Sequence, residues 1–351
     1  MNLYSSKTYM ADIEKAVESV VDMSSLNGSS VLITGASGLI GSFLVDMLVT
    51  YNKKTAAGIK VYATGRSISR LEERFSGISD DSLVFVQHDV NSIPDFDFDV
   101  DYIIHAASNA YPAAFNDYPV DTVMSNVSGT FNLLEYGRKK SAKRFMFVSS
   151  GEVYGQGDTE LDSFREDYSG YVDILQPRSC YPAGKRTAET LCVSYTKQYG
   201  LETVIVRPCH TYGPNATSAD NRANVQFVNN VLDGKDIVLN SAGNQMRSYN
   251  YVADCASAIL SVLICGKTAE AYNIANSAVR TTIAGFAGEL ARQTGHELIF
   301  AKPDEVALAQ RTPVAKQVLD STKLESLGWK GSYDLSAGIK NTLDVLTEIR
   351  K

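Results

Sequence analysis

A tyrosine and a lysine stand four residues apart in the segment 179–189, which reads SCYPAGKRTAE. Pro182 suits the first turn of a helix, where its missing N–H costs nothing, and the residues after it favour helix. Tyr181 and Lys185 would then share one helix face. The pair is either an aromatic ring beside a solvated lysine, or a phenol whose proton transfer an ammonium assists.

Three glycines follow the first apolar run in TGASGLIGSFLVDML. Gly35, Gly38 and Gly41 lie between a predicted strand and an amphipathic helix. Glycines in such a turn let the backbone approach a pyrophosphate, whose charge is stabilised at the helix N-terminus. This placement favours nucleotide binding over a merely structural turn.

The second apolar run ends in VYATGRS, where an NAD-preferring fold usually carries an acidic residue for the adenosine ribose. Arg66 stands in this region instead. Its guanidinium would suit a 2′-phosphate, so NADP is an open alternative to NAD. Arg66 lying over the adenine, or facing solvent, is the other interpretation.

Small or polar residues follow the later strands, at positions Asp89, Val90, His105, Ala106, Ala107, Ser149, Ser150 and Glu152. The carboxyl ends of parallel strands form the edge at which open α/β sheets bind ligands. Taken singly, each of these residues is also compatible with ordinary packing. Together they suggest that Ser150, Tyr181 and Lys185 face one nicotinamide ring.

The tyrosine and lysine are suited to general base catalysis on energetic grounds. Holding a tyrosine of ordinary pKa about 10 as phenolate near pH 7 requires roughly 4 kcal/mol. One ammonium at about 4 Å supplies roughly that amount at an effective dielectric constant of about 20, and an oxidised nicotinamide would add more. We therefore expect the pKa of Tyr181 to be lowered enough for it to act as a base at physiological pH.

Short apolar runs alternate with helical stretches from residue 30 onward: SVLIT, KVYAT, LVFVQ, YIIHA, RFMFVSS and ETVIVRP. This alternation predicts an α/β fold with a Rossmann-type, doubly wound parallel sheet. We expect an N-terminal helical extension at 1–28, with its helix near 10–23 as an appendage, and a dinucleotide-binding domain at 29–176. Residues 177–351 should form mainly a smaller C-terminal α/β substrate-binding region, with some segments completing the sheet and with DIVLN and AYNIA as further strands.

Composition limits the function. The 351 residues, 44% hydrophobic and 21% charged, are typical of a globular protein with one large or two closely joined domains. A net charge of −7 provides no basic excess for nucleic acid. No segment has the pattern of a signal peptide or a membrane span, and the five cysteines form no CxxC pair. A cytoplasmic protein without a structural metal is therefore expected.

The TGASGLIG turn, the Ser150/Tyr181/Lys185 set and the later RPCHTYGP and GNQMRSYNYVAD segments resemble the extended short-chain dehydrogenase/reductases that modify nucleotide sugars. The resemblance runs from about residue 29 to the C-terminus. Within that superfamily, PVDTVMSNVSGTFNLLEYGRK, SSGEVYG and PRSCYPAGKRTAETLC are most similar to the UDP-glucuronate decarboxylases, also called UDP-xylose synthases. They are similar, less closely, to the sugar 4,6-dehydratases and 4-epimerases.

The resemblance implies roles for individual residues and a tightly bound, recycled NAD or NADP. Tyr181 would take the proton of a sugar 4-hydroxyl while hydride passes from C4 to the cofactor, Lys185 would lower the pKa of the tyrosine and bind the nicotinamide ribose, and Ser150 would hydrogen-bond the reacting oxygen. Glu152 is expected to belong to the catalytic set with these three residues. Substrate binding is expected from Glu152, Gln226 and Arg247, with the arginine on the diphosphate. Cofactor contacts are expected from Gly35, Ser37, Gly38, Leu39, Ile40, Gly41, Arg66, Asp89, Val90, Ala106, Ala107, Ser108, Asn126, Ser149, Tyr181, Lys185, Pro208 and His210.

The reaction that follows C4 oxidation depends on the residues after strand five. The family's dehydratases carry Thr-Asp-Glu there, whereas this chain has Ser150-Gly151-Glu152 and lacks the acid that protonates the leaving hydroxyl. A sugar acid would instead become a β-keto acid and lose carbon dioxide with little help. Decarboxylation of UDP-glucuronate or a related sugar acid is therefore favoured, and 4-epimerisation and 4,6-dehydration are the alternatives. His210, Asn215 and Asn240 depart from the decarboxylase pattern, which leaves the nucleotide base and the sugar open.

Two further expectations come from the resemblance. A catalytically silent NAD(P)-sensing binding protein is the alternative from another class, but such sensors typically lose the tyrosine that this chain keeps. Family members often pair as homodimers through the helix with the Tyr-x-x-x-Lys motif and the helix before strand five, here near 181–199 and 119–140. A homodimer that binds a nucleotide sugar, without nucleic-acid or membrane partners, is expected.

Overall fold

The computed structural model describes residues 2–302 and 314–350, and its main sheet has seven parallel strands. Their order is β10-β6-β5-β4-β1-β2-β3. The strands are β1 (Ser30–Thr34), β2 (Lys60–Gly65), β3 (Leu83–Gln87), β4 (Tyr102–His105), β5 (Arg144–Val148), β6 (Thr203–Pro208) and β10 (Ala271–Ile274). The order 3-2-1-4-5-6 is that of the dinucleotide-binding Rossmann fold, so the predicted fold class is confirmed. The run AYNIA forms β10 and extends this sheet beside β6.

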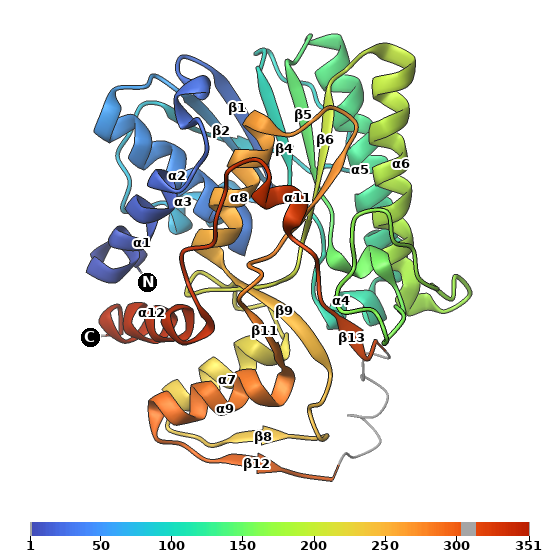
Figure 1. Cartoon of the computed structure of the whole chain (residues 1–351). Helices are drawn as coiled ribbons and strands as arrows, with labels where there is room; N and C mark the ends of the chain where they lie inside the picture. The colour runs from blue at the N-terminus through green and yellow to red at the C-terminus, as the bar shows by residue number, and fades with distance from the viewer. Residues whose placement is uncertain (1, 303–313, 351) are drawn as a thin grey trace.

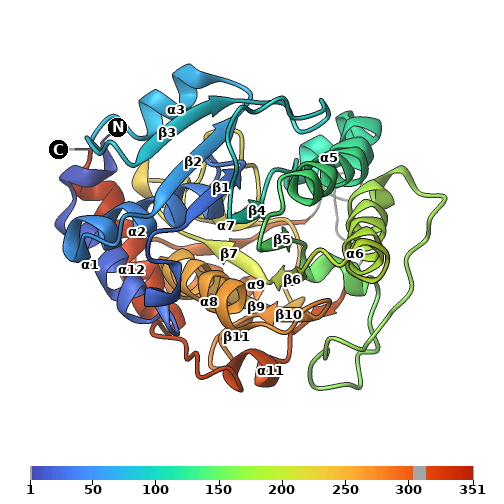
Figure 2. The same cartoon turned by 90° about the horizontal axis from the view of Figure 1, so that it is seen from above.

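Helices cover both faces of the sheet (Figure 1). One face carries α2 (Leu39–Thr55) and α8 (Val252–Cys265), and the other carries α5 (Pro119–Lys139) and α6 (Cys180–Tyr199), which lie side by side (Figure 2). Side chains of a strand alternate between faces. Val31 and Ile33 accordingly pack with the α2 and α8 side chains, whereas Leu32 packs with those of α5 and α6. Burial on both faces explains why the strands read as continuous apolar runs.

The N-terminal helix is part of the main core and not the appendage that we expected. Helix α1 (Lys7–Glu18) contacts α2, α8 and α12 (Leu335–Glu348). Tyr9 and Ile13 are fully buried in the cluster that includes α2 and α8. The carboxylate of Asp12 accepts hydrogen bonds from Tyr251 at 2.6 Å and from Tyr333 and Asn341 at 2.7 Å each. The first and last helices of the chain therefore pack together, as Figure 1 shows.

A smaller α/β region lies beyond the carboxyl edge of the main sheet (Figure 1). It contains α7 (Ala223–Leu232) and α9 (Ile283–Thr294), and the run DIVLN forms β8 (Ile237–Leu239), which pairs with β12 (Leu298–Phe300). A second small sheet is built around β9 (Met246–Tyr251), which pairs with β7 (His210–Tyr212), β11 (Arg280–Thr282) and β13 (Lys316–Gln317). Part of the chain after residue 177 thus forms a smaller α/β region, and β7 directly continues the chain from β6.

Short elements connect these layers. They are α3 (Ile68–Arg74), α4 (Pro112–Asp117), α11 (Thr322–Glu325) and the 3-10 turns η1 (Leu3–Ser5), η2 (Met23–Leu26), η3 (Gly151–Tyr154) and η4 (Pro177–Ser179). Turn η3 follows β5, and η4 leads into α6. Both therefore lie where ligands bind in open α/β sheets. Within residues 2–302 and 314–350, no helix is both long and apolar enough to cross a bilayer.

Candidate active site

The glycine turn connects β1 to α2, and two of its glycines have no room for a side chain. Gly35 has a φ of +66°, and a Cβ there would lie 2.9 Å from the Ala107 backbone. A Cβ on Gly41 would lie 2.3 Å from the carbonyl oxygen of Gly35. Helix α2 starts directly after Gly38, so its N-terminal N–H groups lie beside the turn. The turn therefore has the close packing and free backbone donors that a pyrophosphate site requires.

One cavity at the carboxyl edge of the sheet brings most of the predicted residues together. The glycine turn contributes Gly35, Gly38, Leu39, Ile40 and Gly41 to its lining. Later strand ends and α6 contribute Ala106, Ser108, Ser149, Ser150, Glu152, Tyr181, Lys185, Pro208 and His210. The predicted nucleotide turn and the predicted catalytic set therefore share a single cavity.

Helix α6 holds Tyr181 and Lys185 on one face, at its first two turns. Lys185 is 2% exposed, its Nζ donates a 2.7 Å hydrogen bond to the carbonyl of Val148, and it lies 4.6 Å from the Phe147 ring centroid. Burial lowers the pKa of Lys185 to about 7. The lysine is thus fixed at the end of β5 by a main-chain acceptor.

Burial raises the pKa of Tyr181 to about 12, and the Glu152 carboxylate adds to this shift, while Ser150, Arg222 and Arg178 oppose it. The Nζ of Lys185 lies 5.7 Å from the Tyr181 ring centroid. In the protein chain without a cofactor the pKa of Tyr181 is therefore raised, and the lowering expected from Lys185 together with an oxidised nicotinamide stays a prediction. Desolvation of the ring outweighs a lysine charge at this distance, because burial disfavours the charged phenolate.

Glu152 forms an ion pair that sequence reasoning missed. Its Oε1 lies 2.9 Å from Nη2 of Arg178, and the two side chains are 26% and 28% exposed. The guanidinium carbon of Arg178 also lies 4.5 Å from the Phe115 ring centroid. Burial lowers the pKa of Arg178, but the charge and hydrogen bond of Glu152 outweigh burial and raise it. The motif PRSCY contained this arginine, but nothing local in the sequence linked it to Glu152.

A second ion pair on the cavity wall was also missed. Arg222, just before α7, contacts the Asp220 carboxylate at 2.6 Å and donates to the carbonyl of Thr211 at 3.0 Å. Both charged residues line the cavity together with His210. Burial lowers the pKa of His210 to about 3, and the charges of Arg247 and Arg222 act in the same direction. The imidazole is therefore neutral at physiological pH.

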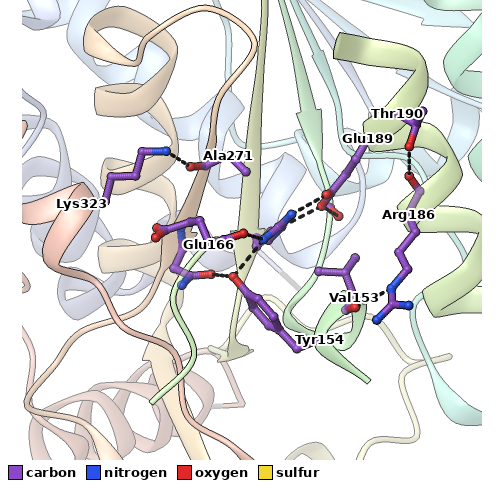
Figure 3. Close-up of polar contacts among 11 residues, drawn as sticks. Val153, Tyr154, Glu166, Arg186, Glu189, Thr190, Ala271 and Lys323 are labelled. Carbon is purple, nitrogen blue, oxygen red and sulfur yellow. Dashed lines mark hydrogen bonds and ion pairs between the residues drawn. The ribbon is translucent and has the colours of Figure 1, made fainter. Parts of the chain in front are cut away.

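A polar network joins α6 to the main sheet, and Figure 3 shows its contacts around Tyr154 and Glu189. Arg207 on β6 contacts Glu189 of α6 through Nε at 2.9 Å and Nη2 at 2.7 Å, and its Nη1 reaches the Tyr154 hydroxyl at 3.0 Å. Ser149 donates to the same Glu189 at 2.6 Å. Ser149 therefore lines the cavity, while its hydroxyl is engaged with the network that joins α6 to the sheet.

Several predicted cofactor residues do not line the cavity. Arg66 and Asp89 are exposed, and Ser37 and Ala107 lie beside the glycine turn and the end of β4. Val90 is buried, and a Cβ on Gly129 would lie 2.9 Å from its side chain. Asn126 is fully buried and accepts a 3.1 Å hydrogen bond from Ser108, which does line the cavity. The roles of these residues in cofactor binding stay predictions.

Two predicted substrate residues also lie off the cavity lining. The Arg247 guanidinium donates to the carbonyls of Met246, Val314 and Ala315 at 2.6–3.3 Å, and its side chain is buried. Burial lowers its pKa. Gln226 is exposed on α7 and donates to the carbonyl of Asn221 at 2.9 Å. The structure therefore brings neither residue to the side of Tyr181.

Comparisons with known proteins agree with this geometry. A sequence profile of the NAD dependent epimerase/dehydratase family matches residues 31–275. The chain is 35% identical over 314 residues to UDP-glucuronic acid decarboxylase 6 of Arabidopsis thaliana, covering 88% of this chain and 86% of the relative. It is 30% identical over 315 residues to UDP-glucuronic acid decarboxylase 1 of Danio rerio, covering 89% and 71%.

Solved structures show the same fold. A dTDP-glucose 4,6-dehydratase from Streptomyces venezuelae, crystallised with NAD, has a TM-score of 0.77 at 25% identity over 92% of this chain and 98% of its own. A UDP-glucose 4-epimerase from Thermotoga maritima has a TM-score of 0.77 at 24% identity, over 92% of this chain and 100% of its own. With its Rossmann sheet, glycine turn and Tyr-x-x-x-Lys helix, the chain belongs to the NAD dependent epimerase/dehydratase family of enzymes.

Proposed function

We propose that this enzyme oxidises a nucleotide sugar at C4 and decarboxylates UDP-glucuronate. The observation that carries the proposal is the convergence of Ser150, Glu152, Tyr181 and Lys185 on the cavity that also contains the glycine turn. Relatives named UDP-glucuronic acid decarboxylase match most of the chain, which supports the same substrate here. The solved 4,6-dehydratase and 4-epimerase share the fold, so these reactions are the alternatives to be tested.

NAD fits the residues at this edge of the sheet. The turn at Gly35 and Gly41 leaves no space for a Cβ and places the N-terminus of α2 beside the cavity, as a bound pyrophosphate requires. We propose that this turn, Ser108 and Lys185 hold the cofactor, whose nicotinamide ring would supply the hydride acceptor. The exposed Arg66 supports NADP as the alternative, and titration of the protein with each dinucleotide distinguishes the two.

Tyr181 is the proposed acceptor of the C4 hydroxyl proton. Because burial raises its pKa, ionisation requires positive charge close to the ring. Arg222 and Arg178 act in this direction, and the Nζ of Lys185 lies 5.7 Å from the ring centroid. Ser150 lies in the same cavity to hydrogen-bond the reacting oxygen. The Val148 carbonyl fixes the position of the Lys185 ammonium. Tyr181, Ser150 and Lys185 would thereby hold the sugar C4 hydroxyl in place while its proton passes to Tyr181.

The acidic groups of the cavity favour decarboxylation over dehydration. Elimination of water requires a free acid at the leaving hydroxyl. Gly151 has no side chain, Glu152 is paired with Arg178, and Asp220 is paired with Arg222. A β-keto acid needs no such acid to lose carbon dioxide. The described wall of the cavity is therefore better suited to a sugar acid than to a neutral hexose.

The deciding experiment is mass spectrometry and NMR of products after incubation with NAD or NADP and single nucleotide sugars. We expect UDP-glucuronate to lose the mass of carbon dioxide and UDP-glucose to stay unchanged. Loss of the mass of water from a hexose, or inversion at C4 without a mass change, would assign the dehydratase or epimerase reaction instead. Cofactor binding with no turnover of any sugar would favour the sensing protein.

We further propose a homodimer in the cytoplasm. Support for the dimer comes from apolar side chains that are exposed along the paired helices: Val120, Met124 and Phe131 on α5, and Val193 and Tyr199 on α6. An apolar surface of this kind on two adjacent helices is typical of an interface. The net charge of −7 argues against a nucleic-acid partner.

A further inference from the structure

The ion pair of Glu152 and Arg178 joins two turns that are far apart in the sequence. Glu152 belongs to η3 after β5, and Arg178 belongs to η4 just before α6. Glu152 lines the cavity that holds Tyr181, and Arg178, outside the lining residues, contacts it at 2.9 Å. Within the described residues, Glu152 is also the only side-chain acceptor to which Arg178 donates. The pair therefore contributes both a negative and a positive group next to the reacting ring.

Arg178 is held in place by more than its partner. Its guanidinium carbon lies 4.5 Å from the Phe115 ring centroid, and Phe115 stacks on Tyr181 with centroids 4.5 Å apart. A cation over an aromatic face is attracted to it. Phe115 thus contacts both the guanidinium and Tyr181, so the position of the positive charge relative to Tyr181 does not depend on Glu152 alone.

Pairing gives the cavity wall an unusual charge balance for a protein with a net charge of −7. Glu152 and Asp220 are the acidic residues of the lining, and each contacts an arginine, Arg178 and Arg222 respectively. Lys185 adds a further basic group. The described wall therefore carries no unpaired carboxylate that would repel an anionic sugar.

We propose that Arg178, by neutralising Glu152 in their ion pair, allows the cavity to accept a sugar acid. The inference rests on the proposed function, because it concerns the substrate class of that site. Without Arg178, the Glu152 carboxylate would lie beside the sugar carboxylate in a partly desolvated cavity, where like charges repel strongly. With Arg178 present, the pair is neutral, and Glu152 no longer opposes a second carboxylate in the cavity.

The test measures binding in a variant whose turnover is slowed. Full-length, NAD-loaded Tyr181→Phe keeps the ring that stacks on Phe115 but loses the phenol, so dissociation constants for UDP-glucuronate and UDP-glucose can be measured by calorimetry. Arg178→Gln, Arg178→Lys and the double change Arg178→Gln with Glu152→Gln are added to this background. Arg292→Gln is the matched control, because it breaks the exposed Arg292–Glu289 pair on α9, outside the cavity lining.

We expect Arg178→Gln to weaken UDP-glucuronate binding about tenfold or more and UDP-glucose binding less than about threefold. Arg178→Lys keeps the charge and should retain most of the preference. The double variant removes both charges. The ratio of its dissociation constants for UDP-glucose and UDP-glucuronate should therefore return to within about threefold of the ratio in the Tyr181→Phe background. The Arg292→Gln control should change neither affinity.

Equal losses for the two ligands would overturn the inference, because a general loosening of the cavity does not distinguish an acid from a neutral sugar. Failure of the double variant to recover the preference would also overturn it. The product assay on the unmodified enzyme is independent of these measurements. A charge-dependent preference without loss of carbon dioxide would sustain the role of Arg178 and reject the proposed reaction. Decarboxylation without that preference would support the proposed reaction and reject the role of Arg178.

Discussion

The ring of Tyr181 stacks on the ring of Phe115, with centroids 4.5 Å apart and planes inclined by 24°. Phe115 belongs to α4 and is 2% exposed, whereas Tyr181 belongs to the first turn of α6. The stack fixes the direction of the phenol and also removes it from water. The same contact therefore orients the proposed base and contributes to the burial that raises its pKa to about 12.

Replacing Tyr181 by phenylalanine should lower kcat about 10²- to 10⁴-fold, because the ring remains stacked but its proton acceptor is lost. Product formation followed by mass spectrometry gives the rate, and thermal unfolding checks that the fold is retained. Tyr171→Phe is the control, since that tyrosine is 64% exposed and outside the cavity lining. A Tyr181→Phe enzyme with more than about a tenth of the original rate would reject Tyr181 as the base.

Lys185 should make the stability of the cofactor-free protein rise with pH. Its pKa is lowered to about 7 by burial, so between pH 7 and its ordinary value the unfolded chain binds more protons than the folded one. Stability contributed by this group is therefore gained as the pH rises. From pH 7 to 9 the gain is about 2 kcal/mol.

Urea unfolding at both pH values measures this linkage. Lys185→Met removes the titrating group, so its stability should rise about 2 kcal/mol less than that of the unmodified protein over this interval. Lys7→Met, on the exposed surface of α1, is the control. An equal rise in the Lys185→Met protein and the unmodified protein would show that Lys185 titrates near its ordinary pKa.

Gly41→Ala should destabilise the protein by about 1–3 kcal/mol and abolish dinucleotide binding, because the new Cβ would overlap the Gly35 carbonyl oxygen. That contact would be 2.3 Å. Gly288→Ala on α9 is the matched helical control. Its Cβ would lie 3.8 Å from Leu298, so it should leave NAD binding intact and stabilise its helix by about 1 kcal/mol. Unchanged NAD affinity in Gly41→Ala would reject the glycine turn as the cofactor site.

Ile13→Ala should cost about 2–5 kcal/mol in the free energy of unfolding, since Ile13 is fully buried in the main core. Its neighbour Glu14 makes only an exposed ion pair with Lys54, with side chains 47% and 41% exposed. Glu14→Ala should therefore change stability by less than about 0.5 kcal/mol. Urea unfolding compares the two. Similar small effects would mean that α1 is the appendage its sequence suggested.

Phe131→Glu should convert a homodimer to a monomer, because it places a charge on the exposed apolar surface of α5. Phe131 is 47% exposed. Light scattering gives the mass, which should be that of one 38.2 kDa chain for the variant and twice that for the unmodified protein. Ile93→Glu is the control, at a residue 79% exposed and outside α5 and α6. A monomeric unmodified protein would reject the proposed dimer.

Local patterns in the sequence determined much of the fold. The strands β1 to β6 coincide with the mainly apolar runs, because a strand that is covered on both faces buries most of its side chains. The turn at Gly35 and Gly41 was recognisable because only glycine tolerates its positive φ and its close contacts. Tyr181 and Lys185 were recognisable because helical geometry places residues four apart on one face. Each of these features depends on interactions within a few residues.

Only the tertiary structure decided the electrostatics and the position of the remaining elements. The helical period of α1 predicted a helix, but burial of Ile13 requires α2, α8 and α12 to surround it. Arg178 contacts Glu152 only because folding brings η3 and η4 together. The Arg247 guanidinium donates its hydrogen bonds to main-chain carbonyls. A pKa depends on burial and on charges brought near by folding. The sequence therefore predicted the spacing of Tyr181 and Lys185, but not the burial that raises the Tyr181 pKa in the chain without cofactor.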